Sequence, residues 1–262
     1  MVWKTGEGTV LSGIGKTRYS FTTAGPNTST TFNIEITAAG STNTITKRLI
    51  IAPSEIELMW ESADGYTPPF YRGKSLPISG SNIRVVAIPN TNTIKSGIGN
   101  ISYTWKKSDD TQLDASGYNK NSYVFKNSKF DQTNKVTVTA SSVDGNYNAE
   151  NTIDIPLSKP KIIFYKKSPT DGVLYGNALN IETTMSEDEM TIISEPYYLP
   201  IEDNSDFTYR WKINGESINT PSKKTELTIR PNSRGGYANV SITIENIREL
   251  FQKASNQLKI NL

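Results

Sequence analysis

Apolar and polar residues alternate along short stretches throughout the chain, which is the period of a β-strand with one buried face. The clearest stretches are Phe32-Ile34-Ile36, Val136-Val138-Ala140, Ile153-Ile155, Val240-Ile242-Ile244 and Leu258-Ile260-Leu262. Each is bounded by Gly, Pro, Asn or Asp clusters that favour turns. Residues 246–257 have a helix-like composition but lie between two clear strands. We expect a corner there, with at most one helical turn, that crosses from one sheet to the other. The pattern predicts an all-β fold.

A tryptophan recurs in the same short pattern at nearly one interval. Trp3, Trp105 and Trp211 lie 102 and 106 residues apart, close to the ~100 residues of an immunoglobulin-like sandwich, whose third strand often carries one buried Trp. Other segments repeat in the same order, including Tyr71–Leu76, which matches Tyr175–Leu179. The repeat predicts tandem immunoglobulin-like β-sandwiches, with the three tryptophans as their structural core.

Two boundaries divide the chain into three predicted units. They lie near Pro53-Ser54 and near Leu157-Ser158, where a last strand runs into a short Pro-marked linker. Residues 54–157 and 158–262 are each expected to form a complete sandwich. Residues 1–53 are expected to form a partial one that lacks its first strands. Linkers this short predict a stiff rod.

The partial unit would expose an apolar face and unpaired strand edges. We expect that the chain is a fragment of a longer protein, whose other domains are its first partners. The alternative is that residues 1–53 receive strands from a neighbouring subunit, by self-association or strand complementation.

The first unit resembles the polycystic-kidney-disease-type (PKD) repeat. That family has a Trp, an aromatic-Gly-Asp-Gly turn, an aromatic residue and Gly before the next strand, and a Gly-Ser hairpin. The matching segments are residues 2–8, 21–25 and 33–41. The resemblance implies extracellular modules that serve as spacers and adhesion elements on cell surfaces.

The third unit is similar to immunoglobulin-like domains in uncharacterised surface proteins of candidate-phylum bacteria with reduced genomes. The similarity lies in residues 160–165, 175–179, 209–215 and 250–254. It implies an exported bacterial protein and supplies no active site.

Charge and hydropathy limit which partners and which cellular location the chain is expected to have. Lys and Arg number 28 against 26 Asp and Glu, without a run of like charges, so neither nucleic acid nor an anionic membrane is an expected partner. No stretch approaches the ~18 apolar residues of a membrane span, so we expect no membrane insertion. The Thr, Ser and Asn content favours an extracellular, cell-surface location. The export signal would then lie outside this chain.

The chain has no histidine and no cysteine, which excludes Ser-His-Asp triads, cysteine nucleophiles and His- or Cys-based metal sites. A paired-carboxylate glycosidase would have to use carboxylates from turn-like polar stretches. Such stretches favour a solvated surface, so we predict no enzymatic activity, no catalytic residue and no cofactor. The carboxylates in question are Glu182, Glu187, Asp188, Glu189, Glu202, Asp203 and Asp206.

Calcium is the metal that the acidic clusters would take, because it prefers carboxylate and carbonyl oxygens. Glu202, Asp203 and Asp206 directly precede the third tryptophan strand, and Asp144-Gly145 lies at a predicted hairpin tip. Neither cluster has the fixed ligand spacing of a known calcium loop, so no metal site is assigned.

Surface aromatic rings bind sugars and anchor partners, and two clusters of contact aromatics stand out. Tyr66 and Phe70 belong to the densest aromatic and proline cluster. That cluster has a counterpart in the third unit, which favours packing of a connection or of the interdomain joint over a binding face. Tyr197 and Tyr198 lack an aromatic counterpart in the second unit, so they are the candidates for a contact peculiar to one domain.

These features together favour a non-catalytic extracellular structural or adhesion module, either the spacer or stalk of a bacterial surface protein or part of a surface layer or fibre. Surface glycans or proteins are its expected external partners. The alternative is a carbohydrate-binding or accessory module of a secreted enzyme, which explains only the aromatic residues.

Overall fold

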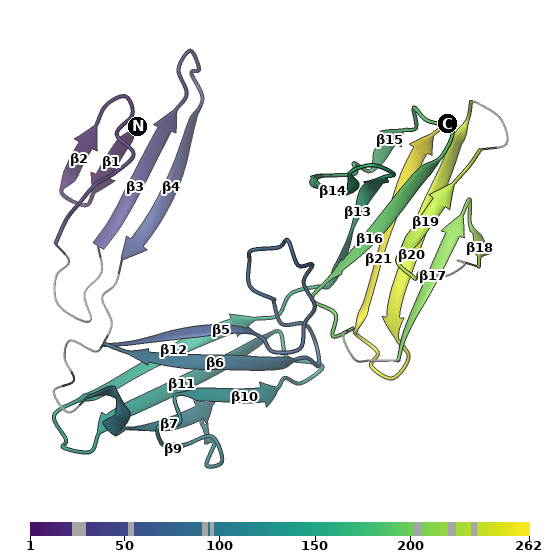
Figure 1. The fold of residues 1–262 in the computed structure, drawn as a ribbon. Coiled ribbons are helices and arrows are strands. Elements are labelled where there is room, and N and C mark those ends of the chain that lie inside the picture. Colours follow the sequence, from purple (N-terminus) through teal and green to yellow (C-terminus); the bar gives the residue numbers. More distant parts are fainter. Residues whose placement is uncertain are drawn as a thin grey trace.

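The computed structural model describes residues 1–22, 30–51, 55–90, 94, 97–201, 206–219, 224–231 and 235–262. The described residues form five β-sheets (Figure 1). The helical content of this part of the chain is one short 3-10 helix, η1 (Ile98–Asn100), and no helix in it could cross a membrane. The prediction of an all-β, immunoglobulin-like sandwich fold is confirmed.

The first sheet, called here the N-terminal sheet, is antiparallel with the strand order β2-β1-β3-β4. Its strands are β1 (Val2–Thr5), β2 (Gly8–Ser12), β3 (Thr30–Thr37) and β4 (Thr44–Ile51). Residues 1–22 and 30–51 form no second sheet over it. Trp3 is therefore only partly buried, which differs from its predicted place between two sheets.

The central sandwich consists of two sheets that share one core. The first has the order β10-β6-β5 and contains β5 (Ile56–Ser62), β6 (Asn82–Pro89) and β10 (Ser122–Lys126). The second has the order β12-β11-β7-β8, with β9 also paired to β7. Its strands are β7 (Ile101–Lys107), β8 (Asp110–Thr111), β9 (Gly117–Tyr118), β11 (Thr133–Ser142) and β12 (Asn148–Pro156).

The C-terminal sandwich repeats this plan, with β14 and β15 added and no counterpart of β9 among the described residues. Its first sheet, in the order β14-β13-β16-β19, contains β13 (Lys161–Ser168), β14 (Gly172–Ala178), β16 (Met190–Tyr197) and β19 (Glu226–Ile229). Its second, in the order β15-β21-β20-β17-β18, contains β15 (Glu182–Thr184), β17 (Phe207–Ile213), β18 (Glu216–Ile218), β20 (Tyr237–Asn246) and β21 (Lys253–Asn261). β15 joins the edge of β21 in parallel. The domain boundaries remain predictions, and residues 52–54 lie outside the described residues.

The tryptophans hold equivalent places in the three units. Trp105 and Trp211 are 0% and 1% exposed. The indole N–H of each tryptophan donates to the backbone carbonyl of a lysine further along the chain: Trp3 to Lys16 (3.0 Å), Trp105 to Lys120 (2.8 Å) and Trp211 to Lys224 (3.0 Å). An indole that is buried needs such an acceptor, and these bonds tie each tryptophan strand to the segment of the lysine.

One local expectation was wrong, and one pair of matching segments differs in structure. The segment after β20 does not cross between sheets, because β20 and β21 pair in the same sheet. The buried Asn246 and Gln252 side chains hydrogen-bond to each other at 2.9 Å and close this hairpin. Residues 71–76 form no strand, whereas their predicted counterpart contributes to β14, which pairs with β13.

Candidate functional site

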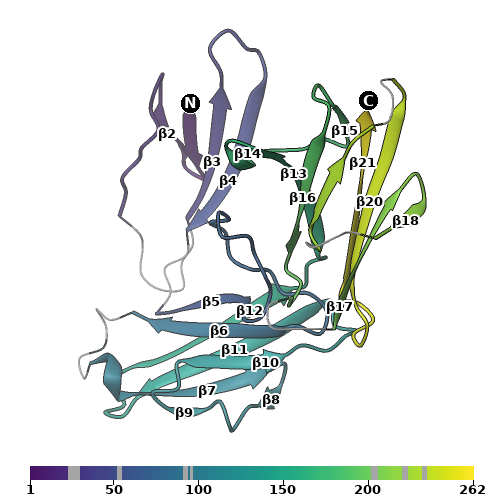
Figure 2. The same ribbon diagram turned by 45° about the vertical axis from the view of Figure 1, so that its right-hand side comes forward.

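The connection between β5 and β6, residues 63–81, is called here the bridging loop, because it leaves its own sandwich and packs on the next one. Ile78 is 0% exposed and belongs to the core cluster of the C-terminal sandwich. Tyr71 and Leu76 pack against the same cluster. Figures 1 and 2 show the loop beside the C-terminal sandwich, which rises steeply from one end of the central one. Part of the C-terminal core is thus supplied by the connection between two strands of the central sandwich.

A pair of backbone hydrogen bonds fixes the loop to the C-terminal sandwich. Tyr66 N–H donates to Leu199 O at 2.9 Å, and Tyr198 N–H donates to Tyr66 O at 2.7 Å. Tyr198 has φ of 73°, a left-handed conformation that is uncommon for a bulky residue. Such strain persists only where the surroundings enforce it, and the bond to Tyr66 is one of the contacts that do so.

Aromatic rings from the two sides interlock next to this backbone pair. Phe70 stacks on Tyr175 with ring centroids 4.0 Å apart and meets Tyr165 edge to face at 5.6 Å. Tyr71 meets Tyr197 edge to face at 5.4 Å. Aromatic pairs in these geometries contribute about 0.5–1.5 kcal/mol each beyond the area they bury, so the three contacts form a substantial part of the joint.

A buried carboxylate connects the phenols of both sides. Glu195 accepts from Tyr175 Oη at 2.9 Å and from Tyr66 Oη at 3.3 Å, and its side chain is buried. A second phenol contact crosses the joint, with Tyr71 Oη and Tyr198 Oη 3.5 Å apart. The carboxylate therefore holds one tyrosine from each sandwich, and its buried oxygens have the partners that burial requires.

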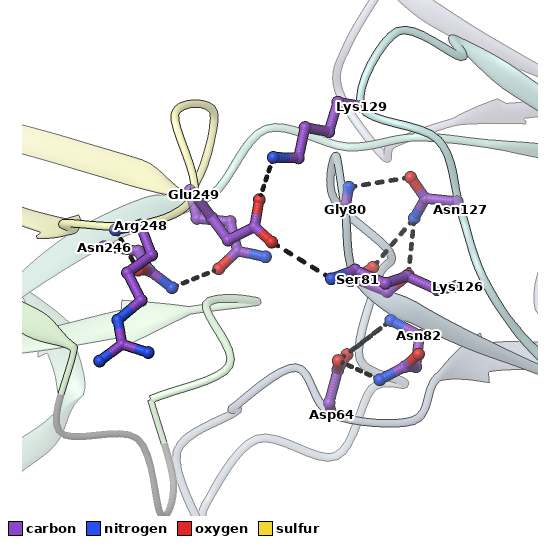
Figure 3. Close-up of polar contacts among 11 residues, drawn as sticks. Asp64, Gly80, Ser81, Asn82, Lys126, Asn127, Lys129, Asn246, Arg248 and Glu249 are labelled. Atoms are coloured by element: carbon purple, nitrogen blue, oxygen red, sulfur yellow. Dashed lines mark hydrogen bonds and ion pairs between the residues drawn. The ribbon is translucent and has the colours of Figure 1, made fainter.

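Both ends of the bridging loop are anchored to the central sandwich. At its start, Asp64 accepts from the backbone N–H (3.0 Å) and the side-chain amide (2.8 Å) of Asn82. At its end, the buried Asn127 accepts from Gly80 N–H at 2.9 Å (Figure 3). Asn127 also donates to Ile78 O at 2.8 Å. Gly80 has φ of +74°, a conformation that glycine adopts without strain. These bonds turn Ile78 away from its own sandwich and toward its neighbour.

A charged contact between the two sandwiches lies near Gly80, at the end of the bridging loop (Figure 3). Glu249, in the β20–β21 connection, pairs with Lys129 at 2.6 Å and with Lys126 at 3.2 Å (Figure 3). Hydrogen bonds from Lys129 and then Lys126 lower the pKa of Glu249. Exposed ion pairs contribute at most about 1 kcal/mol each, so this contact orients the joint more than it stabilises it. Beside it, Phe130 and Phe251 meet edge to face at 6.1 Å.

The four candidate contact aromatics all lie in or beside the joint. Tyr66 and Phe70 come from the bridging loop and face the C-terminal sandwich. Tyr197 and Tyr198 are buried and face Tyr71. None of the four is a free ring on which a sugar could stack.

The candidate carboxylates are dispersed into separate ion pairs. Glu182 pairs with Lys259 at 2.9 Å, Glu187 with Lys166 at 2.6 Å and Asp206 with Arg248 at 3.2 Å. Glu189 pairs with Arg230, and Asp188 also has an interaction partner. Glu202 and Asp203 lie outside the described residues. Asp144 caps its own hairpin turn by accepting from Ser142 and Asn146. The described residues contain no group of three or more carboxylates that could hold a metal ion.

Sequence reasoning missed three residues that build the joint: Ile78, Asn127 and Glu195. Alternation along a strand gives no signal for Ile78, because the loop that carries it is not a strand. Glu195 lies at the end of β16, where the sequence pattern does not distinguish a buried carboxylate from an exposed one. The one available signal was the apolar triplet Leu76-Pro77-Ile78 inside a connection.

The phenol network makes the joint sensitive to alkali. Burial, followed by the hydrogen bond and charge of Glu195, raises the pKa of Tyr175 to about 12. Burial and the bond to Tyr71 raise the pKa of Tyr198 to about 12. An unfolded tyrosine loses its proton near pH 10, so stability from these phenols is present below that pH and is lost as the pH rises toward 12. We therefore expect the melting temperature of the C-terminal sandwich to decrease as the pH rises from about 10 to about 12.

The Tyr175→Phe and Tyr198→Phe double variant is the matched control, since it keeps the rings and removes the ionisable groups. Its melting temperature should depend less on pH than that of the unaltered chain between pH 9.5 and pH 11.5, measured by circular dichroism. Equal slopes for the two proteins would contradict the assignment.

No protein-family model matches the chain, and no curated protein matches it either. Among solved structures, the chain is similar to the three N-terminal domains of the Highly Immunogenic Outer Capsid protein (Hoc) of bacteriophage RB49. The identity is 14%, the TM-score is 0.40, and the match covers 80% of this chain and 59% of that one. The chain thus spans less than two thirds of the phage structure.

Two further similarities come from bacteria. The fibronectin(III)-like modules of Clostridium thermocellum CbhA match with 12% identity and a TM-score of 0.27, over 78% of this chain and 94% of that one. The Bacteroides ovatus protein SGBP-B of a mixed-linkage glucan utilization locus, solved with a mixed-linkage heptasaccharide, matches with 12% identity and a TM-score of 0.26, over 99% and 59%. The sheets described above establish the fold class.

Proposed function

We propose that this chain is a non-catalytic spacer of an exported bacterial surface protein, in which the bridging loop joins two sandwiches into one rigid element. The observation that carries the proposal is Ile78, a residue of the central sandwich's own loop that is buried in the C-terminal core. A hinge would leave such a loop in solvent. Here the loop adds backbone bonds, stacked rings and a shared carboxylate, all of which resist bending.

Several features support the surface location and the PKD-like kinship as parts of this proposal. The chain has no cysteine, so its sandwiches do not depend on disulfides, and the joint contacts take the place of covalent bracing. The tryptophan that recurs with its lysine acceptor gives all three units one plan. A repeated plan with rigid joints suits a stalk or the subunit of a surface layer.

The carbohydrate-binding alternative has less support. Its candidate rings lie in the joint, and the other tryptophan of the sandwiches, Trp60, is covered by the ammonium group of Lys74, which lies 3.1 Å from the ring centroid. A sugar would have to displace this cation to stack on the indole.

Amide ¹⁵N relaxation of the full chain tests the proposal. In a rigid spacer, amides of the central and the C-terminal sandwich report one common rotational diffusion tensor. The Tyr66→Ala and Phe70→Ala double variant should give each sandwich its own, faster tumbling, because the bond from the Tyr66 phenol to Glu195 and the ring contacts of Phe70 are lost. Tyr118→Ala, which removes an exposed ring of the central sandwich away from the joint, should leave the common tensor intact. Independent tumbling in the unaltered chain would refute the rigid spacer.

A further inference from the structure

Large apolar side chains are exposed on two neighbouring loops, one from each sandwich. Phe130, in the β10–β11 connection of the central sandwich, is 83% exposed. In the β20–β21 connection of the C-terminal sandwich, Ile247, Leu250 and Phe251 are 66%, 79% and 45% exposed. Single exposed apolar residues are ordinary on a protein surface, but a group of them marks an interaction site. These four residues are called here the loop patch.

The two halves of the loop patch lie side by side. The rings of Phe130 and Phe251 meet edge to face with centroids 6.1 Å apart. The hairpin tip that carries Phe251 is held closed by the buried side chains of Asn246 and Gln252, where the amide of Asn246 donates to Gln252 Oε1 at 2.9 Å. The joint between the sandwiches therefore presents both loops to a partner as one surface.

The cations beside the loop patch are more exposed than the carboxylates with which they pair. Lys126 and Lys129 have side chains that are 59% and 44% exposed, whereas the Glu249 side chain that both contact is 23% exposed (Figure 3). The Arg248 side chain is 75% exposed, and that of its partner Asp206 is 24% exposed. The surface around the apolar side chains thus presents mainly cationic groups to solvent.

A third carboxylate, next to the hairpin tip, shows the same difference in exposure. The Glu245 side chain is 23% exposed and pairs with Arg210 and Lys253, whose side chains are 52% and 53% exposed. Counted over the described residues, these pairs contain five cations and three carboxylates, an excess of two positive charges. Asp131, in the other loop, pairs with Lys107 at 3.9 Å and leaves this excess unchanged.

Two physical effects favour binding at such a surface. Covering the exposed apolar side chains lowers the free energy, because it removes apolar area from water. The positive charge around them attracts acidic groups and repels basic ones. Phenylalanine and arginine are also enriched in protein interfaces. The chemistry that complements the loop patch is therefore apolar and acidic together.

We infer that the loop patch is a docking site for an acidic segment of a partner polypeptide, in which apolar side chains are interspersed with carboxylates. The apolar side chains cover the patch, and the carboxylates pair with the exposed Lys126, Lys129 and Arg248. Glu249 and Asp206 already hold these cations in place, so little side-chain entropy is lost on binding. The docking site goes beyond the spacer role, which needs rigidity but no exposed apolar surface. It rests on the rigid joint only in that the joint keeps the two loops together.

Two other occupants are less favoured. An anionic bilayer attracts each nearby Lys or Arg by about 1 kcal/mol. The whole chain, however, has 28 Lys and Arg against 26 Asp and Glu, and carboxylates lie among the cations around the patch. A second copy that met this patch with its own patch would set like charges opposite each other. A polypeptide segment can instead place each carboxylate beside one cation.

Titration of the full chain with synthetic peptides, followed by amide chemical shifts, tests the docking site. The probe is a short peptide in which glutamate alternates with leucine. It should shift the amide signals of residues 126–130 and 247–253 and few others. One control peptide has lysine in place of glutamate, and a second has serine in place of leucine. Each control should bind about tenfold more weakly, because it lacks one of the two complementary features.

A matched pair of protein variants tests the apolar part of the site. Phe130→Ser together with Leu250→Ser should weaken binding of the probe by about tenfold or more, because both contacts with the leucines are lost. Val143→Ser together with Ile181→Ser removes two apolar residues, 73% and 81% exposed, outside the loop patch. This control should leave the affinity unchanged. All four positions are strongly exposed, so both variants should keep the fold.

Several results would overturn the docking site. Among them are no binding of the probe, equal binding of either control peptide, and an unchanged affinity in the Phe130→Ser and Leu250→Ser variant. Phosphatidylglycerol vesicles that shift the same amides when the probe does not would identify a bilayer as the occupant. Shifts that grow with chain concentration alone would identify a second copy. Relaxation reports on the joint and the titration on the patch, so the rigid spacer and the docking site can fail separately.

Discussion

Replacing Trp211 by alanine is expected to lower the free energy of unfolding of the C-terminal sandwich by about 3–5 kcal/mol, the range for a large buried aromatic residue. The indole is 1% exposed, lies 6.1 Å from the Phe164 ring and donates to Lys224 O at 3.0 Å. Alanine at this position leaves a cavity and removes the indole donor from Lys224 O. Because whole domains are stable by only about 5–15 kcal/mol, the sandwich should be close to unfolding.

Two variants separate the causes of this loss. Trp211→Phe retains most of the ring volume but removes the bond to Lys224, so its effect should be intermediate. Trp60→Ala deletes the same side chain at a partly buried position and should have a smaller effect. Urea denaturation followed by circular dichroism gives the three values. A loss for Trp211→Ala no larger than that for Trp60→Ala would disprove the role of Trp211 as a core residue.

The second large loss of stability is expected in the C-terminal sandwich after a substitution in a loop of the central sandwich. Ile78→Ala is expected to destabilise the C-terminal sandwich by about 2–5 kcal/mol, as for other buried isoleucines, although the residue lies in a loop of the central sandwich. Its side chain is part of the C-terminal core. Ile83→Ala is the matched control, since Ile83 is equally buried only five residues later but belongs to the central core.

Hydrogen exchange measured by mass spectrometry distinguishes the two variants, because it reports the stability of each sandwich separately. Ile78→Ala should raise exchange in β16, β20 and β21, and Ile83→Ala in β6, β10 and β11. If Ile78→Ala loosened only the central sandwich, the bridging loop would not be part of the C-terminal core.

The strands could be predicted because each buries one face and thus alternates. In β20, for example, Ala238, Val240, Ile242 and Ile244 are all buried. The hairpin at Asn214-Gly215 could be predicted too, since both residues have the positive φ, 51° and 87°, that this dipeptide favours. These features depend on neighbours in sequence or on a single sheet, so a local pattern contains them.

The joint could be predicted only in part, because its contacts depend on how two sandwiches meet. The aromatic density around Tyr66 and Phe70 indicated packing, but nothing local marks Ile78 as a core residue of the next sandwich. The recurrence of the lysine acceptors is visible in the sequence, because Lys16, Lys120 and Lys224 lie at intervals of 104 residues. Their role as acceptors follows only from the indole hydrogen bonds in the structure, because every residue type has a backbone carbonyl.

The measurement that tests the rigid joint most directly is a distance distribution between the two sandwiches. The chain has no cysteine, so spin labels at Val143→Cys and Ile181→Cys, both strongly exposed positions, are the only labels attached. Pulsed electron–electron double resonance should give a narrow distance distribution in the otherwise unaltered chain. The distribution should become broad after Tyr66→Ala and Phe70→Ala. A distribution that is equally broad with and without these two substitutions would contradict the account.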